Sequence, residues 1–134
     1  MDTHSKHLLV EFRGCDPDKL NDPPLIRQVM HDAAVAAGAT VVQTVVHTFS
    51  PHGVTGVVVV EESHLSIHTW PEASYAAMDF FTCGGCDPHA ARDLVRSALG
   101  ARSVETLEVH RGLHDGSVPS IEVRGHELME SADG

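Results

Sequence analysis

Basic residues are scarce in this chain. Nine lysines and arginines stand against 19 aspartates and glutamates in 134 residues, and the formal net charge is −10 at pH 7. Because the nine basic residues do not cluster, the chain lacks the basic patch that a phosphate backbone requires, which argues against a nucleic-acid partner. The acidic balance suits a cationic or amine-bearing ligand, although solubility alone would also explain it.

Cysteines are few and long apolar runs are absent. Cys15, Cys83 and Cys86 make an odd number, and the first residues show no targeting pattern, so a disulfide framework is not expected. No apolar run is long enough to span a bilayer. These absences predict a cytoplasmic protein with no membrane partner.

The patterns along the chain predict a single α+β domain over residues 1–134. Capping residues followed by proline begin two amphipathic helices, at about 23–37 and 88–99. β-Branched and alternating segments predict strands at 6–13, 40–49, 54–61, 65–70, 75–82 and 103–110. Short links favour antiparallel pairing, so we expect a two-layer sandwich, with two helices covering one face of a mostly antiparallel sheet. Residues 121–123 have the pattern of a short edge strand, and residues 127–134 are predicted to be a flexible tail.

The segment from Val57 to Cys86 gathers polar and titratable side chains inside the predicted sheet. Strand alternation separates a polar face from an apolar one; the polar face carries His64, Ser66, His68 and Trp70, and the other carries Leu65, Ile67 and Thr69. Burying such polar groups without partners costs about 1–3 kcal/mol each, so an ordinary core strand would not carry them. The pattern favours a face that lines a functional site.

Each of these residues also has an ordinary structural interpretation. His64 would be a hydrogen-bonded histidine at a sheet edge, and Trp70 would be a core residue. Ser63 would belong to a common turn, and Glu61 and Glu62 would be a solvated charge pair. These alternatives remain open at the level of residue patterns.

A metal or redox site is a competing interpretation. Cys83 and Cys86 have the spacing of metal ligands, and with His64 and His68 they would make a tetrahedral zinc set. The two histidines lie on a predicted strand, and a single C-x-x-C is a weak signal. The two cysteines also have the spacing of a redox pair, but their surroundings do not resemble a thioredoxin unit. We expect no metal.

Residues 61–72 read EESHLSIHTWPE, and this string closely resembles the processing motif of the short bacterial and archaeal S-adenosylmethionine decarboxylase precursors. The resemblance covers about residues 6–101. It is carried by the flanking segments 7–12, 14–16, 49–51, 53–54, 75–77 and 81–84. A motif of this length is unlikely to match by chance.

The resemblance implies an inactive precursor that cleaves itself between Glu62 and Ser63 into chains 1–62 and 63–134. The Ser63 hydroxyl would attack the carbonyl carbon of Glu62 to form an ester. β-Elimination and loss of ammonia would then leave a pyruvoyl group as the cofactor. His68 is implied as the base in this processing.

For turnover, the resemblance implies a Schiff base between the pyruvoyl group and the substrate amine, with Cys83 as the proton donor. The implied substrate is S-adenosylmethionine, and the product is the aminopropyl donor for spermidine. The family builds its site in a dimer, so a homodimer is expected. The implied substrate-binding residues are Phe49, Leu65, Trp70 and Glu72.

One departure from the family pattern concerns Thr55. The turn usually reads Gly-Val-Ser-Gly, and its serine hydroxyl assists processing, whereas residues 53–56 read GVTG here. Threonine keeps the hydroxyl and adds a methyl group. Two further functions stay open, namely a pyruvoyl decarboxylase of ornithine or arginine and an inactive homologue that acts as a regulatory partner.

Overall fold

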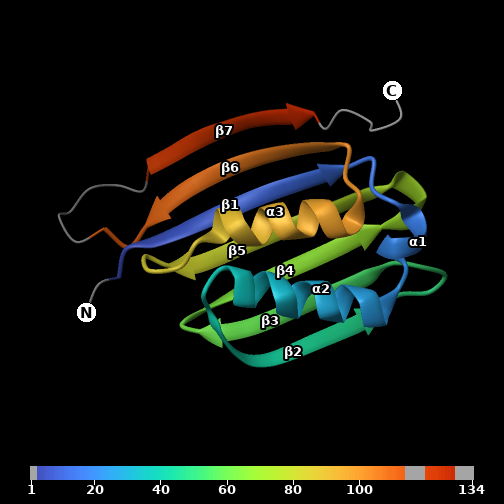
Figure 1. The fold of residues 1–134 in the computed structure, drawn as a ribbon, viewed down its shortest axis with the longest axis horizontal. Helices are drawn as coiled ribbons and strands as arrows, with labels where there is room; N and C mark the ends of the chain where they lie inside the picture. Colours follow the sequence, from blue (N-terminus) through green and yellow to red (C-terminus); the bar gives the residue numbers. More distant parts are fainter. Residues whose placement is uncertain (1–2, 114–119, 129–134) are drawn as a thin grey trace.

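Seven antiparallel strands form one sheet in the computed structural model, which describes residues 3–113 and 120–128 (Figure 1). The spatial order is β2-β3-β4-β5-β1-β6-β7. The strands are β1 (Ser5–Arg13), β2 (Thr40–Thr48), β3 (Val54–Glu61), β4 (Ser63–Trp70), β5 (Tyr75–Cys83), β6 (Ser103–Arg111) and β7 (Ser120–Leu128).

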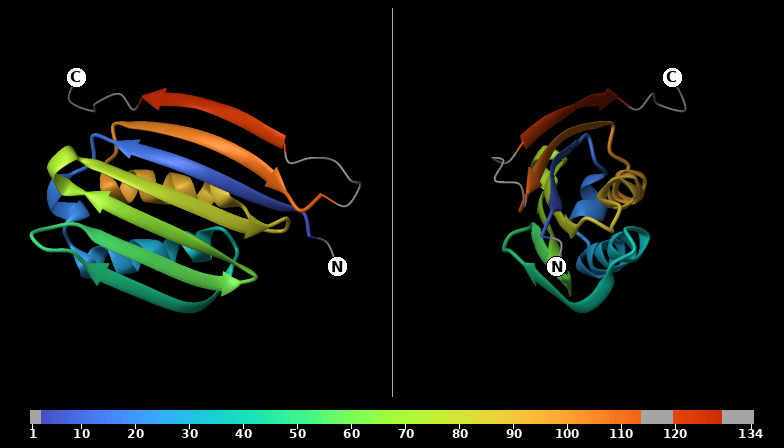
Figure 2. Two further views of the ribbon diagram at one scale, coloured as in Figure 1. Left: turned by 180° about the vertical axis from the view of Figure 1, so that it is seen from behind. Right: turned by 90° about the vertical axis from the view of Figure 1, so that its left-hand side faces the viewer.

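Two long helices, α2 (Pro23–Ala36) and α3 (Pro88–Leu99), lie side by side on one face of the sheet (Figures 1 and 2). Asp22 and Asp87 cap them by accepting hydrogen bonds from backbone N–H groups of the first turn. None of the described helices is both long and apolar enough to cross a membrane. The predicted two-layer α+β architecture is confirmed.

Short elements depart from the prediction. A four-residue helix, α1 (Pro17–Leu20), and a 3-10 turn, η1 (Pro71–Ala73), were not predicted. Strand β4 begins two residues earlier than predicted, at Ser63, so the proposed cleavage point lies at the first residue of a strand.

The C-terminal part of the sheet is longer than its sequence pattern indicates. Strand β7 has nine residues and pairs with β6, where only a short strand at 121–123 had been expected. Glu127 and Leu128 belong to this strand, so the predicted tail begins too early. The rest of that tail, residues 129–134, lies outside the described residues.

The core lies between the helices and the sheet. Alternate residues of the central strands face the helices and are fully buried, including Leu8, Phe12, Leu65, Ile67 and Phe80. They meet the apolar stripes of α2 and α3, which supply Ile26, Met30, Ala33, Ala91, Val95 and Leu99. The opposite face of the sheet has no covering element among the described residues (Figure 2), and we call it the open face.

Candidate active site

Strand β4 divides its side chains between the core and the open face as the alternation predicts. Leu65, Ile67 and Thr69 are buried, whereas His64, Ser66, His68 and Trp70 are at least partly exposed. Residues of β4 lie opposite residues on the neighbouring strands, and these pairs continue across the sheet as rows of side chains. One such row on the open face runs through His47, Thr55, His68, Ala77, Glu11 and Glu105.

A pocket of about 370 Å³ opens at the Trp70 end of β4. It is formed where β2 ends, β3 begins and β4 runs into η1. Five of the residues singled out in the sequence come together here, although they span 24 positions of the chain. The lining consists of Phe49, His52, Gly53, Thr55, His68, Thr69, Trp70 and Glu72.

Two polar pairs define the electrostatics of the pocket. Thr55 and His68 lie directly opposite each other on β3 and β4, and Thr55 Oγ1 lies 3.0 Å from Nδ1 of His68. This contact fixes the orientation of the imidazole ring. His52 Nε2 lies 2.8 Å from Glu72 Oε2, a contact that the sequence pattern did not indicate.

Aromatic rings line the mouth of the pocket. Trp70 is 42% exposed and stacks on Tyr75, with centroids 5.2 Å apart and planes 23° apart. Phe49 is 52% exposed, and its ring makes a T-shaped contact with the His47 ring, with ring centroids 4.8 Å apart. Exposed aromatic faces beside the Glu72 carboxylate suit a flat or cationic ligand.

Glu11 is a further acidic group on the open face, and sequence reasoning missed it. Its carboxylate accepts a hydrogen bond from the hydroxyl of Tyr75, whose ring stacks on Trp70. Burial raises the pKa of the Glu11 carboxyl, although the nearby Arg13 guanidinium opposes that rise. Only the pairing of β1 with β5 reveals this proximity, because 64 positions separate Glu11 from Tyr75.

Ser63 and Cys83 lie at the other end of the sheet. Ser63 begins β4 opposite Val60, and Cys83 ends the neighbouring strand β5 opposite Ser5. His68 lies five positions after Ser63 along β4, which at the usual strand rise is about 16 Å. One chain therefore holds the predicted reacting groups, Ser63 on β4 and Cys83 on β5, away from the predicted base His68.

Leu65 lies apart from the other residues that the resemblance implied for substrate binding. Its side chain is fully buried on the helix side of β4 and does not line the pocket. Its position between two outward-facing residues turns its side chain toward the core. The Leu65 side chain therefore packs in the core of this chain, and its contact with substrate stays a prediction.

The cysteines and histidines do not form the zinc set considered above. The described residues contain no group of three or more histidine, cysteine, aspartate or glutamate side chains that could hold a metal ion. Cys83 and Cys86 do approach each other, with their Sγ atoms 3.5 Å apart. All three cysteines are free thiols.

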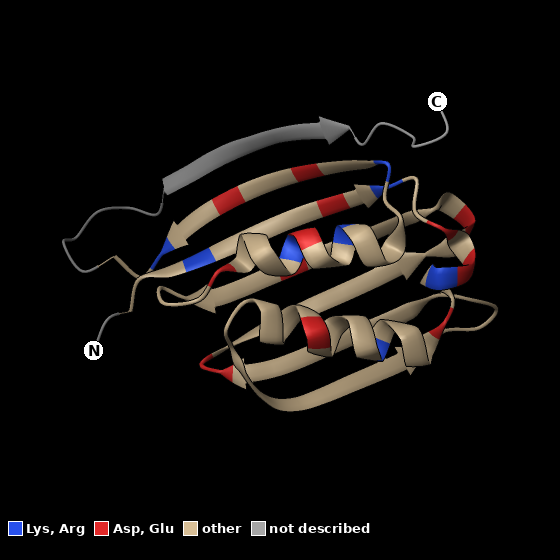
Figure 3. Cartoon of the chain, viewed as in Figure 1, with Lys and Arg blue, Asp and Glu red and all other residues tan. Residues whose placement is uncertain are grey.

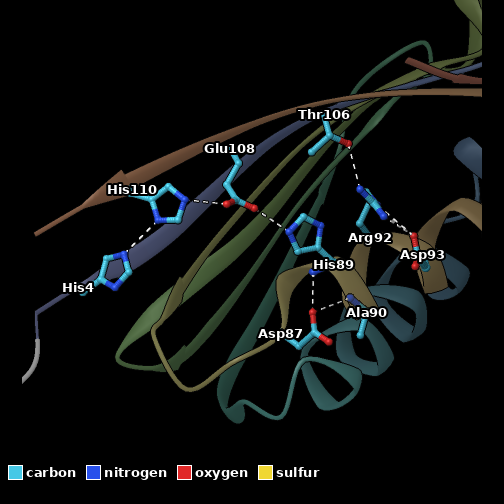
Figure 4. Close-up of polar contacts among 9 residues, drawn as sticks. All are labelled: His4, Asp87, His89, Ala90, Arg92, Asp93, Thr106, Glu108 and His110. Carbon is cyan, nitrogen blue, oxygen red and sulfur yellow. Dashed lines mark hydrogen bonds and ion pairs between the residues drawn. The ribbon is translucent and has the colours of Figure 1, made fainter. Parts of the chain in front are cut away.

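A second titratable cluster lies beneath the start of α3, on the helix side of the sheet (Figure 4). Glu108 is 1% exposed, and its two carboxylate oxygens lie 2.7 Å from Nε2 of His89 and of His110. His110 in turn lies 3.1 Å from His4. The two histidines give the buried Glu108 carboxylate its polar partners, and the contact with His89 links α3 to β6. The cluster shares no residue with the pocket.

Comparison with known proteins gives a consistent result. A family model described as S-adenosylmethionine decarboxylase matches residues 6–112. An S-adenosylmethionine decarboxylase proenzyme from Anoxybacillus flavithermus is 48% identical over 113 residues, covering 84% of this chain and 91% of that protein. Proenzyme 2 of Halalkalibacterium halodurans is 47% identical over 114 residues, covering 84% and 90%. The crystal structure of adenosylmethionine decarboxylase from Aquifex aeolicus aligns with a TM-score of 0.77 at 33% identity, covering 88% of this chain and 98% of that one.

Proposed function

The chain belongs to the S-adenosylmethionine decarboxylase family, and from that premise we propose that it is a self-processing precursor whose active site forms between two copies. It is a carboxy-lyase that acts on S-adenosylmethionine. The family implies that its product serves as the aminopropyl donor in spermidine synthesis. The observation that carries the proposal is the pocket in which Phe49, Trp70 and Glu72 surround the Thr55–His68 pair.

The pocket has the chemistry that this substrate requires. Trp70 and Phe49 offer exposed rings on which an adenine can stack, and a sulfonium cation favours aromatic faces. The Glu72 carboxylate can accept hydrogen bonds from ribose hydroxyls. Ornithine and arginine carry no adenosine, so they would leave these rings unused. Decarboxylation assays with all three substrates should therefore give carbon dioxide only from S-adenosylmethionine.

Processing is proposed to begin at Ser63, which directly follows Glu62 at the start of β4, so that its hydroxyl can reach the Glu62 carbonyl carbon by closing a five-membered ring. Ser63 Oγ attacks the carbonyl carbon of Glu62, the peptide C–N bond breaks, and an ester forms. A base removes the α-proton of Ser63, and the Glu62 carboxylate leaves as the Cα=Cβ double bond forms. The new N-terminal dehydroalanine hydrolyses with loss of ammonia.

The residue at this position fits the proposed cofactor, because serine provides both the attacking hydroxyl and the oxygen that leaves. Processing would yield chains 1–62 and 63–134, the second beginning with a pyruvoyl group. That group supplies an electrophilic carbonyl, which binds the substrate amine and accepts the electrons released as carbon dioxide departs. The remaining tasks of binding, orientation and proton transfer fall to the residues of this chain.

The separation of Ser63 from His68 supports a site shared between copies. Side-chain proton transfer needs a contact of about 3 Å or one intervening water. A distance of about 16 Å along one strand excludes that contact within a chain. We propose that Ser63 and Cys83 of one copy meet the Thr55–His68 pocket of a second copy.

The open face has the surface that such pairing requires. Leu9, Val45 and Val59 lie on it and are 39%, 49% and 41% exposed. Figure 3 shows that β2 and β4 carry no lysine, arginine, aspartate or glutamate. The open face therefore has exposed valines and no charge over β2 and β4, whereas Glu11, Asp79 and Glu105 place charges over β1, β5 and β6. Exposed apolar side chains of this kind suit a two-fold dimer.

Cys83 is proposed as the group that protonates the substrate α-carbon after decarboxylation. Cys83 is the last residue of β5, at the end of the sheet where Ser63 begins β4, and it is partly exposed. A thiol that donates a proton must stay reduced. This requirement and the three free thiols support the cytoplasm as the proposed compartment.

Intact mass spectrometry tests the processing proposal. The purified protein should give two fragments, 1–62 and 63–134, and the second should be lighter by one ammonia than a fragment that starts with serine. The Ser63→Ala variant should remain a single chain and release no carbon dioxide, because alanine has neither a nucleophile nor a leaving oxygen. Two fragments from that variant would contradict the mechanism.

A further inference from the structure

The loop that follows β5 brings two thiols together. Cys86 donates its backbone N–H to the carbonyl oxygen of Cys83 at 3.1 Å, which closes a four-residue turn around two exposed glycines. The Sγ atoms of the two cysteines lie 3.5 Å apart. Asp87 then caps α3, so the turn is anchored by β5 on one side and by a helix on the other.

This backbone geometry is already compatible with a disulfide. A closed turn holds its first and last Cα atoms within about 7 Å, and a disulfide requires a similar Cα separation. A sulfur–sulfur bond of about 2.0 Å would need the two Sγ atoms to approach by about 1.5 Å. The glycines at 84 and 85 allow that adjustment without side-chain clashes.

The third cysteine, Cys15, is buried, whereas Cys83 and Cys86 are partly exposed. Cys15 is 3% exposed, and burial raises the pKa of its thiol to about 12. The pKa of Cys86 is raised to about 11 by burial and by the contact with Cys83. Cys86 therefore holds its proton at neutral pH and acts second, once Cys83 has reacted.

We propose that Cys83 and Cys86 form a redox-responsive dithiol, and that its reversible oxidation to a disulfide switches off decarboxylation. The proposal rests on the proposed role of Cys83 as the proton donor. In the disulfide, Cys83 no longer has the S–H group that this role requires. Both cysteines lie on the 63–134 fragment, so the disulfide can form in the mature enzyme without joining its two fragments.

The oxidant is a low-molecular-weight disulfide such as oxidised glutathione. The Cys83 thiolate attacks one of its sulfurs, giving a mixed disulfide and one glutathione thiolate. Cys86 then loses its proton and attacks the sulfur of Cys83, expelling the second glutathione. The two cysteines are oxidised, and one oxidised glutathione is reduced to two molecules of glutathione.

The test uses the mature, cleaved enzyme in glutathione buffers, followed by thiol alkylation and fragment mass spectrometry. Under oxidising buffer the 63–134 fragment should lose two hydrogens and take up no alkylating agent, whereas the 1–62 fragment should keep the Cys15 thiol. Carbon dioxide release should fall about 100-fold or more, the usual contribution of a positioned acid, and should return with dithiothreitol.

Cys86→Ser and Cys86→Ala are the matched variants, and both should cleave and decarboxylate when reduced. They can form only a mixed disulfide, whose amount depends on the ratio of oxidised to reduced glutathione. The wild-type disulfide depends also on total glutathione, and at a fixed ratio it should decrease as the total rises. Parallel inactivation of wild type and variants would overturn the switch, as would a disulfide that leaves activity intact.

Failure of the proposed function would look different. If the chain does not cleave, peptide mapping of the whole chain still detects or excludes the Cys83–Cys86 bond. If Cys83→Ala decarboxylates as fast as wild type, the proton-donor role is wrong, and the switch based on that role is overturned with it.

Discussion

The two ends of β4 differ in what their side chains offer. At the Trp70 end, a preformed pocket combines exposed aromatic rings, a carboxylate and an oriented imidazole. At the Ser63 end lie a serine hydroxyl and, on the neighbouring strand, a thiol. We propose that the first end recognises the ligand and that the second reacts with it. The separation of about 16 Å between them in one chain supports the proposal that a complete site needs two copies.

The largest effect is expected from Cys83 at the reactive end. Cys83→Ala should cleave normally, because the thiol takes no part in the proposed processing, but should decarboxylate about 100-fold more slowly or worse. Fragment masses and carbon dioxide release measured on the same sample separate the two steps. Full activity would remove Cys83 from its proposed role.

Leu65 lies between the two ends of β4, and its substitution should lower the stability of the fold and leave substrate binding unchanged. Leu65→Ala deletes fully buried atoms and should lower the free energy of unfolding by about 2–5 kcal/mol. Denaturant unfolding of the uncleavable Ser63→Ala background measures this cost without interference from processing. In the cleaved protein, an unchanged KM would agree with the core position, and a KM raised more than that of Trp70→Leu would restore Leu65 to the binding site.

At the recognition end, Trp70→Leu should raise KM about tenfold and change kcat little, since stacking contributes to binding by about 1–2 kcal/mol. Trp70→Phe keeps a ring and serves as the matched control, with a smaller rise. Steady-state assays over a range of substrate concentrations provide both parameters. Equal KM values for Trp70→Leu and wild type would mean that substrate binds elsewhere.

The smallest effect is expected at Thr55. Thr55→Ala removes the hydroxyl that contacts Nδ1 of His68 and should slow processing several-fold, because one hydrogen bond is worth about 1 kcal/mol. Thr55→Ser keeps the hydroxyl and should cleave at close to the wild-type rate. A time course of fragment formation distinguishes the two variants. If Thr55→Ser were as slow as Thr55→Ala, the hydroxyl would not be the group that matters.

Residue patterns predicted the parts of this molecule that depend on local rules. The caps of α2 and α3 and the alternating faces of β4 follow from residues close together in sequence. The Thr55–His68 and His52–Glu72 contacts do not, because they depend on strand register and on where η1 turns the chain. The buried Glu108 cluster escaped detection for the same reason, since it joins β6 to α3 and the start of the chain.

For two residues, the family motif alone did not show where the side chain lies. Leu65 matched a functional position by sequence, but its place in the alternation turns it into the core. The resemblance implied no role for Cys86, yet the turn after β5 brings its Sγ atom to 3.5 Å from that of Cys83. Both outcomes were decided by backbone geometry, which a motif does not specify.

The most direct test of a shared site is a complementation experiment with two inactive variants. Ser63→Ala cannot be cleaved, and His68→Ala lacks the proposed base. Each alone should remain uncleaved, but in mixed dimers the Ser63 of the His68→Ala chain meets the His68 of the other chain. Co-production should therefore give cleavage of the His68→Ala chain alone, with carbon dioxide release restored in part. No cleavage, in a preparation shown to contain mixed dimers, would contradict the account.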